Sequence, residues 1–337
     1  MKAAIFYGPE DVKTEDVDIP VIEPKQILVK VKACGICGTD LHTYRSGLYS
    51  AASRQSEKGP ILGHEVSGDV VEVGRKVRNI EVGDRVASIG FGGMAEYIPI
   101  NVALGYNVAK LPPEISYEEA ATLDPLLNSI HAMMKGNPSN NEAIVIFGAG
   151  TIGLGIIQCL RALELNLRKL IVIDLSDYRL NVAEQLGADE VINVSVHNPI
   201  RKIKRFAGSR PMLLLPIVSP LVDIIYECVG HTKEMTRTPI IQQALNIVNE
   251  FTGRIVVVGM YGAKLNLDLS LLVTKQATIS GSYAWSPSDF SKGIELMETK
   301  EVNRLKIISH EFSLNRAKEA FDQASNANES LKVLIKP

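Results

Sequence analysis

The residues best suited to chemistry lie in two short segments of the first half of the chain. Cys37, Thr39 and His42 fall within six consecutive residues, and His64 is followed directly by Glu65. Thiolates, imidazoles and carboxylates are the usual ligands of zinc, and a catalytic zinc needs about three protein ligands so that one position stays open. The two segments are too far apart for a zinc finger. Their pattern therefore indicates a site that the fold assembles from separate turns.

The remaining cysteines do not extend this pattern. Cys34 and Cys37 have the spacing of a redox pair, but no strand–helix–strand pattern follows them, so we expect Cys34 to pack inside a strand. With Cys159 and Cys228 the chain has four cysteines, too few and too unevenly spaced for a disulfide framework. A reducing, cytoplasmic location is the expectation that follows.

A glycine-rich turn in the middle of the chain is typical of dinucleotide binding. The residues are Gly148-Ala-Gly150-Thr151-Ile152-Gly153, between an apolar strand pattern at 143–147 and a helical pattern at 154–164. In such a turn the glycines allow a tight bend and close approach of the backbone to a pyrophosphate, and the helix N-terminus supplies free N–H groups. The flanking strand and helix make the motif far more specific than its glycines alone.

Asp174 ends the next apolar strand, about 20 residues after the last glycine, as the dinucleotide fingerprint requires. Its carboxylate is expected to bind the adenosine ribose hydroxyls and to repel an added phosphate, which favours NAD over NADP. We also place Thr151, Ile152 and Arg179 among the cofactor-binding residues. The alternative is that the glycines only form a tight turn and that Asp174 caps the helix that follows at Ser176 and Asp177.

Two domains are expected to position these groups. The first 125 residues contain short strands broken by glycine and proline, at 26–33, 66–73 and 85–89, and are predicted to be all-β. From residue 142 onward, strands that are apolar on both faces alternate with helical stretches, which is typical of a parallel sheet covered by helices. These strands are expected at 143–147, 170–173, 223–226 and 254–258.

The end of the chain is expected to return to the first domain. It contains a predicted helix at 287–300, a strand at 305–309 and a last strand near 331–337. The fold class is therefore α/β: a doubly wound parallel sheet domain over 127–286, and a mostly-β catalytic domain over 1–126 and 287–337.

Composition excludes several classes of function. The 337 residues are 46% hydrophobic and 22% charged with a net charge of −2, so the chain has no basic excess for a nucleic acid partner. The N-terminus meets Gly8, Pro9 and two acidic residues too early for a signal peptide. The most apolar run, 211–226, is interrupted by prolines and is too short to cross a bilayer, so no membrane partner is expected.

The ordered set of motifs over essentially the whole chain resembles the zinc-dependent medium-chain dehydrogenases, closest to the branch of sorbitol, 2,3-butanediol and threonine dehydrogenases. The motifs are Gly35-Ile-Cys-Gly-Thr-Asp-Leu-His42, Gly63-His-Glu65, Gly83-Asp-Arg-Val86, Gly93-Met-Ala-Glu-Tyr97 and the glycine turn. The resemblance implies a GroES-like domain joined to a Rossmann domain. It also implies that Cys37 and His64 bind zinc, with Glu65 and Asp124 as third and exchangeable fourth ligands. Either carboxylate could instead act through a bound water.

The chemistry that this implies is oxidation of a secondary alcohol. Zinc lowers the pKa of the hydroxyl, and hydride then passes to the nicotinamide. Thr39 and His42 are expected to relay the hydroxyl proton to solvent, as the resemblance also implies. The alternative is that these two side chains only satisfy backbone groups of their turn.

The chain also departs from many relatives. Only residues 87–92 separate two strands between which those relatives carry a four-cysteine zinc lobe, so we expect one catalytic zinc per subunit and no structural zinc. A homo-oligomer, dimer or tetramer, is expected, and the apolar segment 210–220 is either a subunit contact or local core. The substrate is a small alcohol: a polyol, a vicinal diol or a sugar. Asp124-Pro-Leu-Leu-Asn128 resembles a segment of threonine dehydrogenases, so L-threonine is the alternative substrate.

Two other interpretations of the sequence compete with that of an alcohol dehydrogenase. A zinc-free reductase that uses NADPH would not need Cys37, His64 and Glu65, and it is expected to lack Asp174. A non-enzymatic nucleotide-binding scaffold would keep the glycine turn but would not need metal ligands beside a proton relay.

Overall fold

The structure, a computed structural model, describes residues 1–213, 217–230, 238–262 and 264–337. Contacts between its Cα atoms divide it into two compact units. The first unit comprises residues 1–124 and 290–337, and the second comprises residues 125–289. His231 and residues 214–216 of the apolar segment lie outside the described residues.

The first unit contains two β-sheets. One has the strand order β18-β19-β3-β6-β7-β9, with β8 also paired to β3, and the other has the order β2-β1-β5-β4. The strands are β1 (Lys2–Gly8), β2 (Asp11–Asp16), β3 (Gln26–Gly35), β4 (Arg54–Ser56), β5 (Gly59–Ile61), β6 (Glu65–Val73), β7 (Arg85–Ile89), β8 (Tyr97–Asn101), β9 (Val108–Lys110), β18 (Ile308–Ser313) and β19 (Lys332–Lys336). The strands expected at 26–33, 66–73 and 85–89 are confirmed as β3, β6 and β7.

Alternating apolar residues explain where the core of this unit lies. Ile27, Val29 and Val31 of β3 are buried in one cluster with residues of β6, β7 and β8. That cluster also includes Phe321 of helix α10 (Ala317–Ser325). Because successive side chains of a strand point to opposite faces, every second residue of β3 reaches the same core.

The last strand of the chain completes the first sheet. Leu334 and Ile335 of β19 pair antiparallel with the end of β3, directly before the Cys37 segment. The expected strand at 305–309 is wrong in its first three residues, because Leu305–Ile307 form a 3-10 turn and β18 begins at Ile308.

The all-β prediction for the first 125 residues omitted short helices that carry site residues. Helix α1 (Gly38–Ser46) follows β3, α2 (Tyr117–Ala120) follows β9, and α3 (Leu123–Gly136) begins at the end of this stretch. Their turns bring polar side chains next to the strand ends, as the site below shows.

The second unit is a doubly wound parallel sheet, and the predicted fold class is confirmed. Its six strands have the order β12-β11-β10-β15-β16-β17, and every neighbouring pair is parallel. This is the strand order of dinucleotide-binding folds, whose ligands lie at the carboxyl ends of the strands where the order reverses. The strands are β10 (Ala143–Phe147), β11 (Lys169–Asp174), β12 (Glu190–Asn193), β15 (Ile224–Glu227), β16 (Arg254–Val257) and β17 (Thr278–Gly281).

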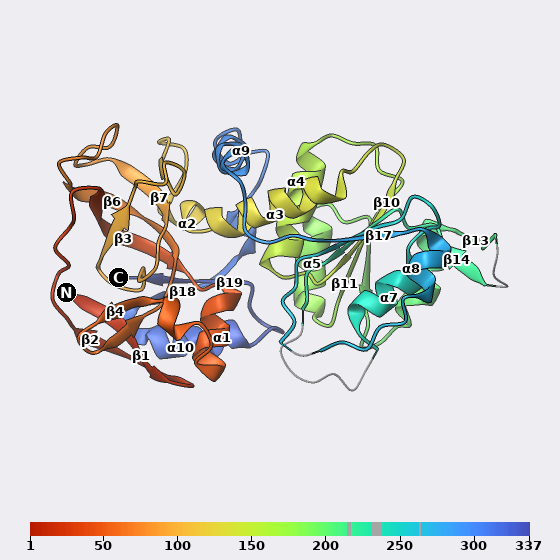
Figure 1. Cartoon of the computed structure of the whole chain (residues 1–337), viewed down its shortest axis with the longest axis horizontal. Coiled ribbons are helices and arrows are strands. Elements are labelled where there is room, and N and C mark those ends of the chain that lie inside the picture. Colours follow the sequence, from red (N-terminus) through yellow and green to blue (C-terminus); the bar gives the residue numbers. More distant parts are fainter. Residues whose placement is uncertain (214–216, 231–237, 263) are drawn as a thin grey trace. The chain divides into compact units, whose positions relative to one another are not determined.

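Helices cover both faces of this sheet, which explains why its central strands are apolar on both sides. All five residues of β10 are buried. Figure 1 shows α4 and α5 on one side of the strands and α7 and α8 on the other. The helices of this unit are α4 (Thr151–Ala162), α5 (Asp177–Gln185), α6 (Pro199–Ala207), α7 (Ile240–Ile247) and α8 (Ser270–Lys275), and a short hairpin is formed by β13 (Ser209–Pro211) and β14 (Val218–Pro220). Helix α9 (Pro287–Glu298) follows, and from Phe290 onward it belongs to the first unit.

No helix in the described ranges has the length and apolar character needed to span a membrane.

Candidate metal centre and nucleotide site

The four predicted metal ligands converge in the first unit. One ligand atom from each of Cys37, His64, Glu65 and Asp124 lies within 4.8 Å of the corresponding atoms of the other three. Elsewhere in the described ranges no other such group is found. A sulfur, an imidazole nitrogen and two carboxylates form a donor set that suits zinc.

Each ligand is positioned at the end of a regular element. Cys37 is the N-cap of α1, and Glu65 is the first residue of β6, directly after His64. Asp124 is the second residue of α3. Residues at element ends leave the hydrogen-bonded ladders, so their side chains can turn toward a common point without breaking a strand or a helix.

Asp40 holds two of these segments together, although the sequence pattern did not single it out. Its carboxylate accepts hydrogen bonds from the backbone N–H of Cys37 at 2.9 Å and of Gly63 at 3.0 Å. Its Oδ1 also lies 3.8 Å from Nδ1 of His64, whereas Nε2 of His64 lies 4.0 Å from Oδ2 of Asp124. Asp40 is the third residue of α1, where a capping acid is common, and that position is the signal that could have found it.

Glu65 is also bound by a lysine from the last strand. The Nζ atom of Lys332 donates to both carboxylate oxygens of Glu65, at 2.8 and 2.6 Å, and to the carbonyl oxygen of Ile36 at 2.9 Å. Both side chains are almost completely buried. Burial lowers the pKa of Lys332, but Glu65, Cys37 and Asp124 together outweigh this effect and raise it. Lys332 therefore stays charged and compensates one carboxylate of the cluster.

The electrostatics of the cluster favour a cation. Burial lowers the pKa of His64, but the neighbouring charges of Asp40 and Cys37 dominate and raise it well above the usual value. By contrast, burial raises the pKa of Cys34, which keeps that thiol protonated. The donor set and its negative potential fit zinc, and Cys34 packs in the strand core as expected.

Thr39 and His42 lie on the helix that Cys37 caps. The Oγ1 atom of Thr39 is 3.4 Å from Sγ of Cys37. His42 is one turn further along α1, a spacing that places the two side chains on the same face of a helix. Burial and the charge of Arg45 lower the pKa of His42, so its imidazole is neutral at neutral pH and is able to accept a proton.

The glycine turn follows β10, as predicted, but α4 begins at Thr151 and not at 154, so the last three residues of the motif are the first three of the helix. A Cβ atom at Gly153 would lie 1.9 Å from the carbonyl oxygen of Gly148, so only glycine allows the helix to pack this closely. A Cβ at Gly150 would meet nothing nearer than Nη1 of Arg179, at 3.8 Å. The turn is thus open on the side where Arg179 lies, which fits a phosphate group. Thr151 and Ile152 are the first two residues of α4.

Asp174 is bonded to the backbone on both sides. Its Oδ2 accepts from the N–H of Ala149 at 2.7 Å, and its Oδ1 accepts from Leu175 at 2.7 Å and from Ser176 at 2.9 Å. The carboxylate thus ties the glycine turn to the start of α5, where Ser176 is the N-cap. These bonds are the capping contacts of the alternative interpretation. They use both lone pairs of Oδ1, and the second lone pair of Oδ2 still allows Asp174 to accept from a ribose hydroxyl.

Glu227 is a second carboxylate that sequence reasoning missed. It ends β15, beside β10 at the point where the strand order reverses, and it is completely buried. Its Oε1 accepts from the N–H groups of Val229 at 2.9 Å and Gly230 at 2.8 Å, and burial raises its pKa. Glu227 therefore shapes the loop where a doubly wound sheet binds its ligand.

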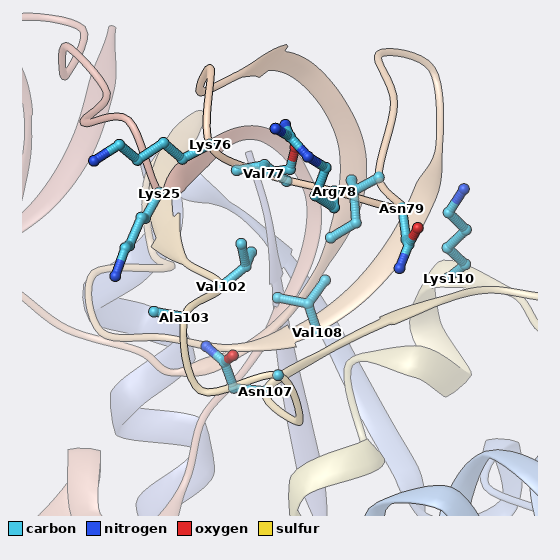
Figure 2. Close-up of a pocket in the computed structure, with 12 residues that line it drawn as sticks. Lys25, Lys76, Val77, Arg78, Asn79, Val102, Ala103, Asn107, Val108 and Lys110 are labelled. Carbon is cyan, nitrogen blue, oxygen red and sulfur yellow. The ribbon is translucent and has the colours of Figure 1, made fainter.

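A cavity of about 500 Å³ opens elsewhere in the first unit, and none of the four metal-ligand candidates lines it. Figure 2 shows Val77, Val102 and Val108 in its middle, with the lysines at its rim. Lys110 there is paired with Asp84 at 2.7 Å. A shallow basic surface of this kind has no group suited to oxidising an alcohol.

Comparison with known proteins agrees with both halves of this description. Residues 23–113 match the family model of the alcohol dehydrogenase GroES-like domain, and residues 151–299 match that of the zinc-binding dehydrogenases. Sorbitol dehydrogenase of Bos taurus is 29% identical over 98% of this chain and 95% of that protein. D-xylulose reductase of Saccharomyces cerevisiae is 28% identical over 96% of this chain and 94% of that protein.

The fold is also similar to that of a solved structure. The structure of 2R,3R-butanediol dehydrogenase of Bacillus subtilis superposes with a TM-score of 0.83 at 27% identity, over 100% of this chain and 99% of that chain.

Proposed function

Because the chain belongs to the zinc-dependent medium-chain dehydrogenases, in the sorbitol and butanediol branch, we propose that it transfers a hydride between a secondary alcohol of a polyol or vicinal diol and NAD. The observation that carries the proposal is the convergence of the Cys37, His64, Glu65 and Asp124 donors within 4.8 Å. A scaffold protein would have no use for such a cluster.

Metal binding and proton transfer are assigned to different residues of the first unit. Cys37, His64 and Asp124 would hold the metal. Glu65, whose charge Lys332 compensates, would be the ligand that exchanges, the role that the resemblance gives to Asp124. When bound, zinc lowers the pKa of the alcohol hydroxyl and NAD accepts the hydride. Oγ1 of Thr39 would accept the hydroxyl proton and release its own, and the neutral imidazole of His42 would take up the released proton and pass it to solvent.

In the second unit, the glycine turn receives the pyrophosphate of NAD and Arg179 supports it. Asp174 binds a ribose hydroxyl with the lone pair of Oδ2 that the backbone leaves. The single zinc per subunit, the homo-oligomer and the cytoplasmic location that the sequence suggests remain predictions.

The test combines metal analysis with turnover. We expect purified protein to contain about one zinc per subunit and to reduce NAD with polyols or vicinal diols. L-threonine belongs in the same panel because of the segment that starts at Asp124. Cofactor binding without turnover of any alcohol would instead favour a scaffold, and turnover of metal-free protein would favour a zinc-free reductase.

A further inference from the structure

Arg54, the first residue of β4, has a partly exposed side chain whose guanidinium is incompletely hydrogen-bonded. Its Nε and Nη2 atoms are buried and have no hydrogen-bond partner among the described residues. Burial lowers the pKa of Arg54, and the charge of Glu57 opposes this effect only partly. Glu57 is exposed and forms no hydrogen bond with these two nitrogens. A cation with buried, unmade hydrogen bonds is costly, so its retention calls for a group that completes it.

The position of Arg54 connects it to the metal centre. Its side chain lies directly against Gly92, where a Cβ atom would be 2.6 to 3.0 Å from the Cβ, Nε and Cδ atoms of Arg54. The N–H of Gly92 donates to the carbonyl oxygen of Gly63 at 2.8 Å, and Gly63 is the residue before His64.

The loop that Arg54 contacts also covers the ligand histidine. The ring of Phe91 lies 5.7 Å from the ring of His64, and 55% of the Phe91 side chain is exposed. One loop residue, Phe91, therefore contacts the predicted metal ligand, and the next, Gly92, contacts Arg54. Arg54 and His64 thus contact neighbouring residues of one loop, which places both side chains in the same part of the first unit.

A planar guanidinium pairs best with a carboxylate or a phosphate, through two parallel hydrogen bonds. We propose that Arg54 binds an anionic end group of the substrate, so that the natural substrate is an acidic polyol: a polyol phosphate or a sugar acid. This inference rests on the proposed function for the position of the reacting hydroxyl. It narrows the proposed substrates from polyols in general to polyols that carry a carboxylate or a phosphate.

The test compares three substrates of one length: a hexitol, the hexitol phosphorylated at one end, and the corresponding aldonate. With zinc-loaded, wild-type protein we expect kcat/KM for at least one charged member to exceed that of the hexitol at least tenfold. Whichever of the two is preferred identifies the anion as a phosphate or a carboxylate. Wild-type protein that prefers the neutral hexitol would overturn the inference and leave the proposed dehydrogenase intact.

Variants then assign the preference to one side chain. We expect Arg54→Met to reduce the ratio of kcat/KM for the charged substrate to kcat/KM for the hexitol to about one. Arg54→Lys keeps the positive charge but lacks the two parallel N–H groups of the guanidinium, so it should give an intermediate ratio. The control is Arg75→Met, which removes the same charge from an exposed residue of the same unit. A preference that survives in Arg54→Met contradicts the inference.

A binding measurement covers the case in which no panel member is oxidised. With NAD saturating the nucleotide site, the charged members should raise the unfolding temperature of wild-type protein and of Arg75→Met, but not of Arg54→Met. Without ligand, Arg54→Met should unfold at the wild-type temperature or above it, because it removes two buried nitrogens that lack hydrogen-bond partners. An equal shift in wild type and Arg54→Met would refute the anion site. A shift lost only in Arg54→Met, without turnover, would support the anion site and refute the proposed function.

Discussion

Lys332 and Glu65 form a buried ion pair inside the cluster of predicted metal ligands, with the lysine Nζ 2.6 Å from Oε2 of the glutamate. The pair is neutral as a unit. With zinc bound, Cys37 and Asp124 would contribute the two negative charges that match the divalent ion, and His64, having given up its proton to the solvent, would contribute a neutral nitrogen. Lys332 thus determines how much charge the cluster offers to a metal, although it lies 267 residues from Glu65 in sequence.

Removing Lys332 should destabilise the protein strongly. Lys332→Met leaves the Glu65 carboxylate buried without its partner, which costs about 3–5 kcal/mol in the free energy of unfolding. Urea unfolding of zinc-free protein measures this cost. Lys336→Met on the same strand is the matched control, because its partly exposed pair with Glu118 is worth at most about 1 kcal/mol. The double variant Lys332→Met with Glu65→Gln should recover most of the loss, and no recovery would contradict the assignment.

Cys37→Ser should remove zinc and turnover but not cofactor binding. The thiolate is the strongest zinc donor of the set, whereas the glycine turn that binds NAD belongs to the second unit. Metal content by mass spectrometry and NAD affinity by fluorescence titration are the two measurements. Cys34→Ala is the control and should keep its zinc. Full activity in Cys37→Ser would end the zinc mechanism.

Asp174→Ala should weaken the preference for NAD over NADP, by roughly 10- to 100-fold in the ratio of kcat/KM values. The loss of the carboxylate removes both the ribose contact and the repulsion of a 2′-phosphate, and Arg179 then lies nearby to bind that phosphate. Adding Arg179→Met should therefore abolish the gain in NADP use. Asp177→Ala, at the first position of the same helix, serves as the control. An unchanged ratio in Asp174→Ala would mean that this residue only caps the turn.

The proton relay should show in the pH dependence of alcohol oxidation. His42 must be neutral to accept a proton, so kcat/KM should fall as the pH drops through its pKa, which burial and Arg45 hold below the ordinary value of about 6.5. Arg45→Met removes one of these influences and should move the acid limb to higher pH.

Replacing the imidazole itself tests the same relay. His42→Gln should lower kcat/KM by roughly 10- to 100-fold at neutral pH and remove that limb. His310→Gln, in the same unit, should leave the profile unchanged. If neither His42→Gln nor Arg45→Met changes the pH profile of kcat/KM, His42 takes no part in proton transfer.

Local patterns were sufficient for the elements with strong periodicity. The buried strand β10, the glycine turn and α4 follow one another over a few residues, so their positions could be predicted to within a few residues. The strand at 305–309 was misplaced by three residues because Leu305 and Ile307 suit either a strand or a 3-10 turn, and only the pairing of β18 with β19 decides where the strand begins.

The sequence by itself determined which residue types were available for chemistry, and it indicated a metal-binding domain and a nucleotide-binding domain, because ligand types and glycine spacings are local properties. Only the tertiary structure decided the partners of those groups. The bond of Glu65 to Lys332 depends on the chain's last strand returning to β3, and the bonds of Asp40 depend on two turns meeting. The lack of a hydrogen-bond partner for Nε and Nη2 of Arg54 within the described residues is likewise invisible in sequence, because a side chain's hydrogen bonds depend on every segment that folds around it.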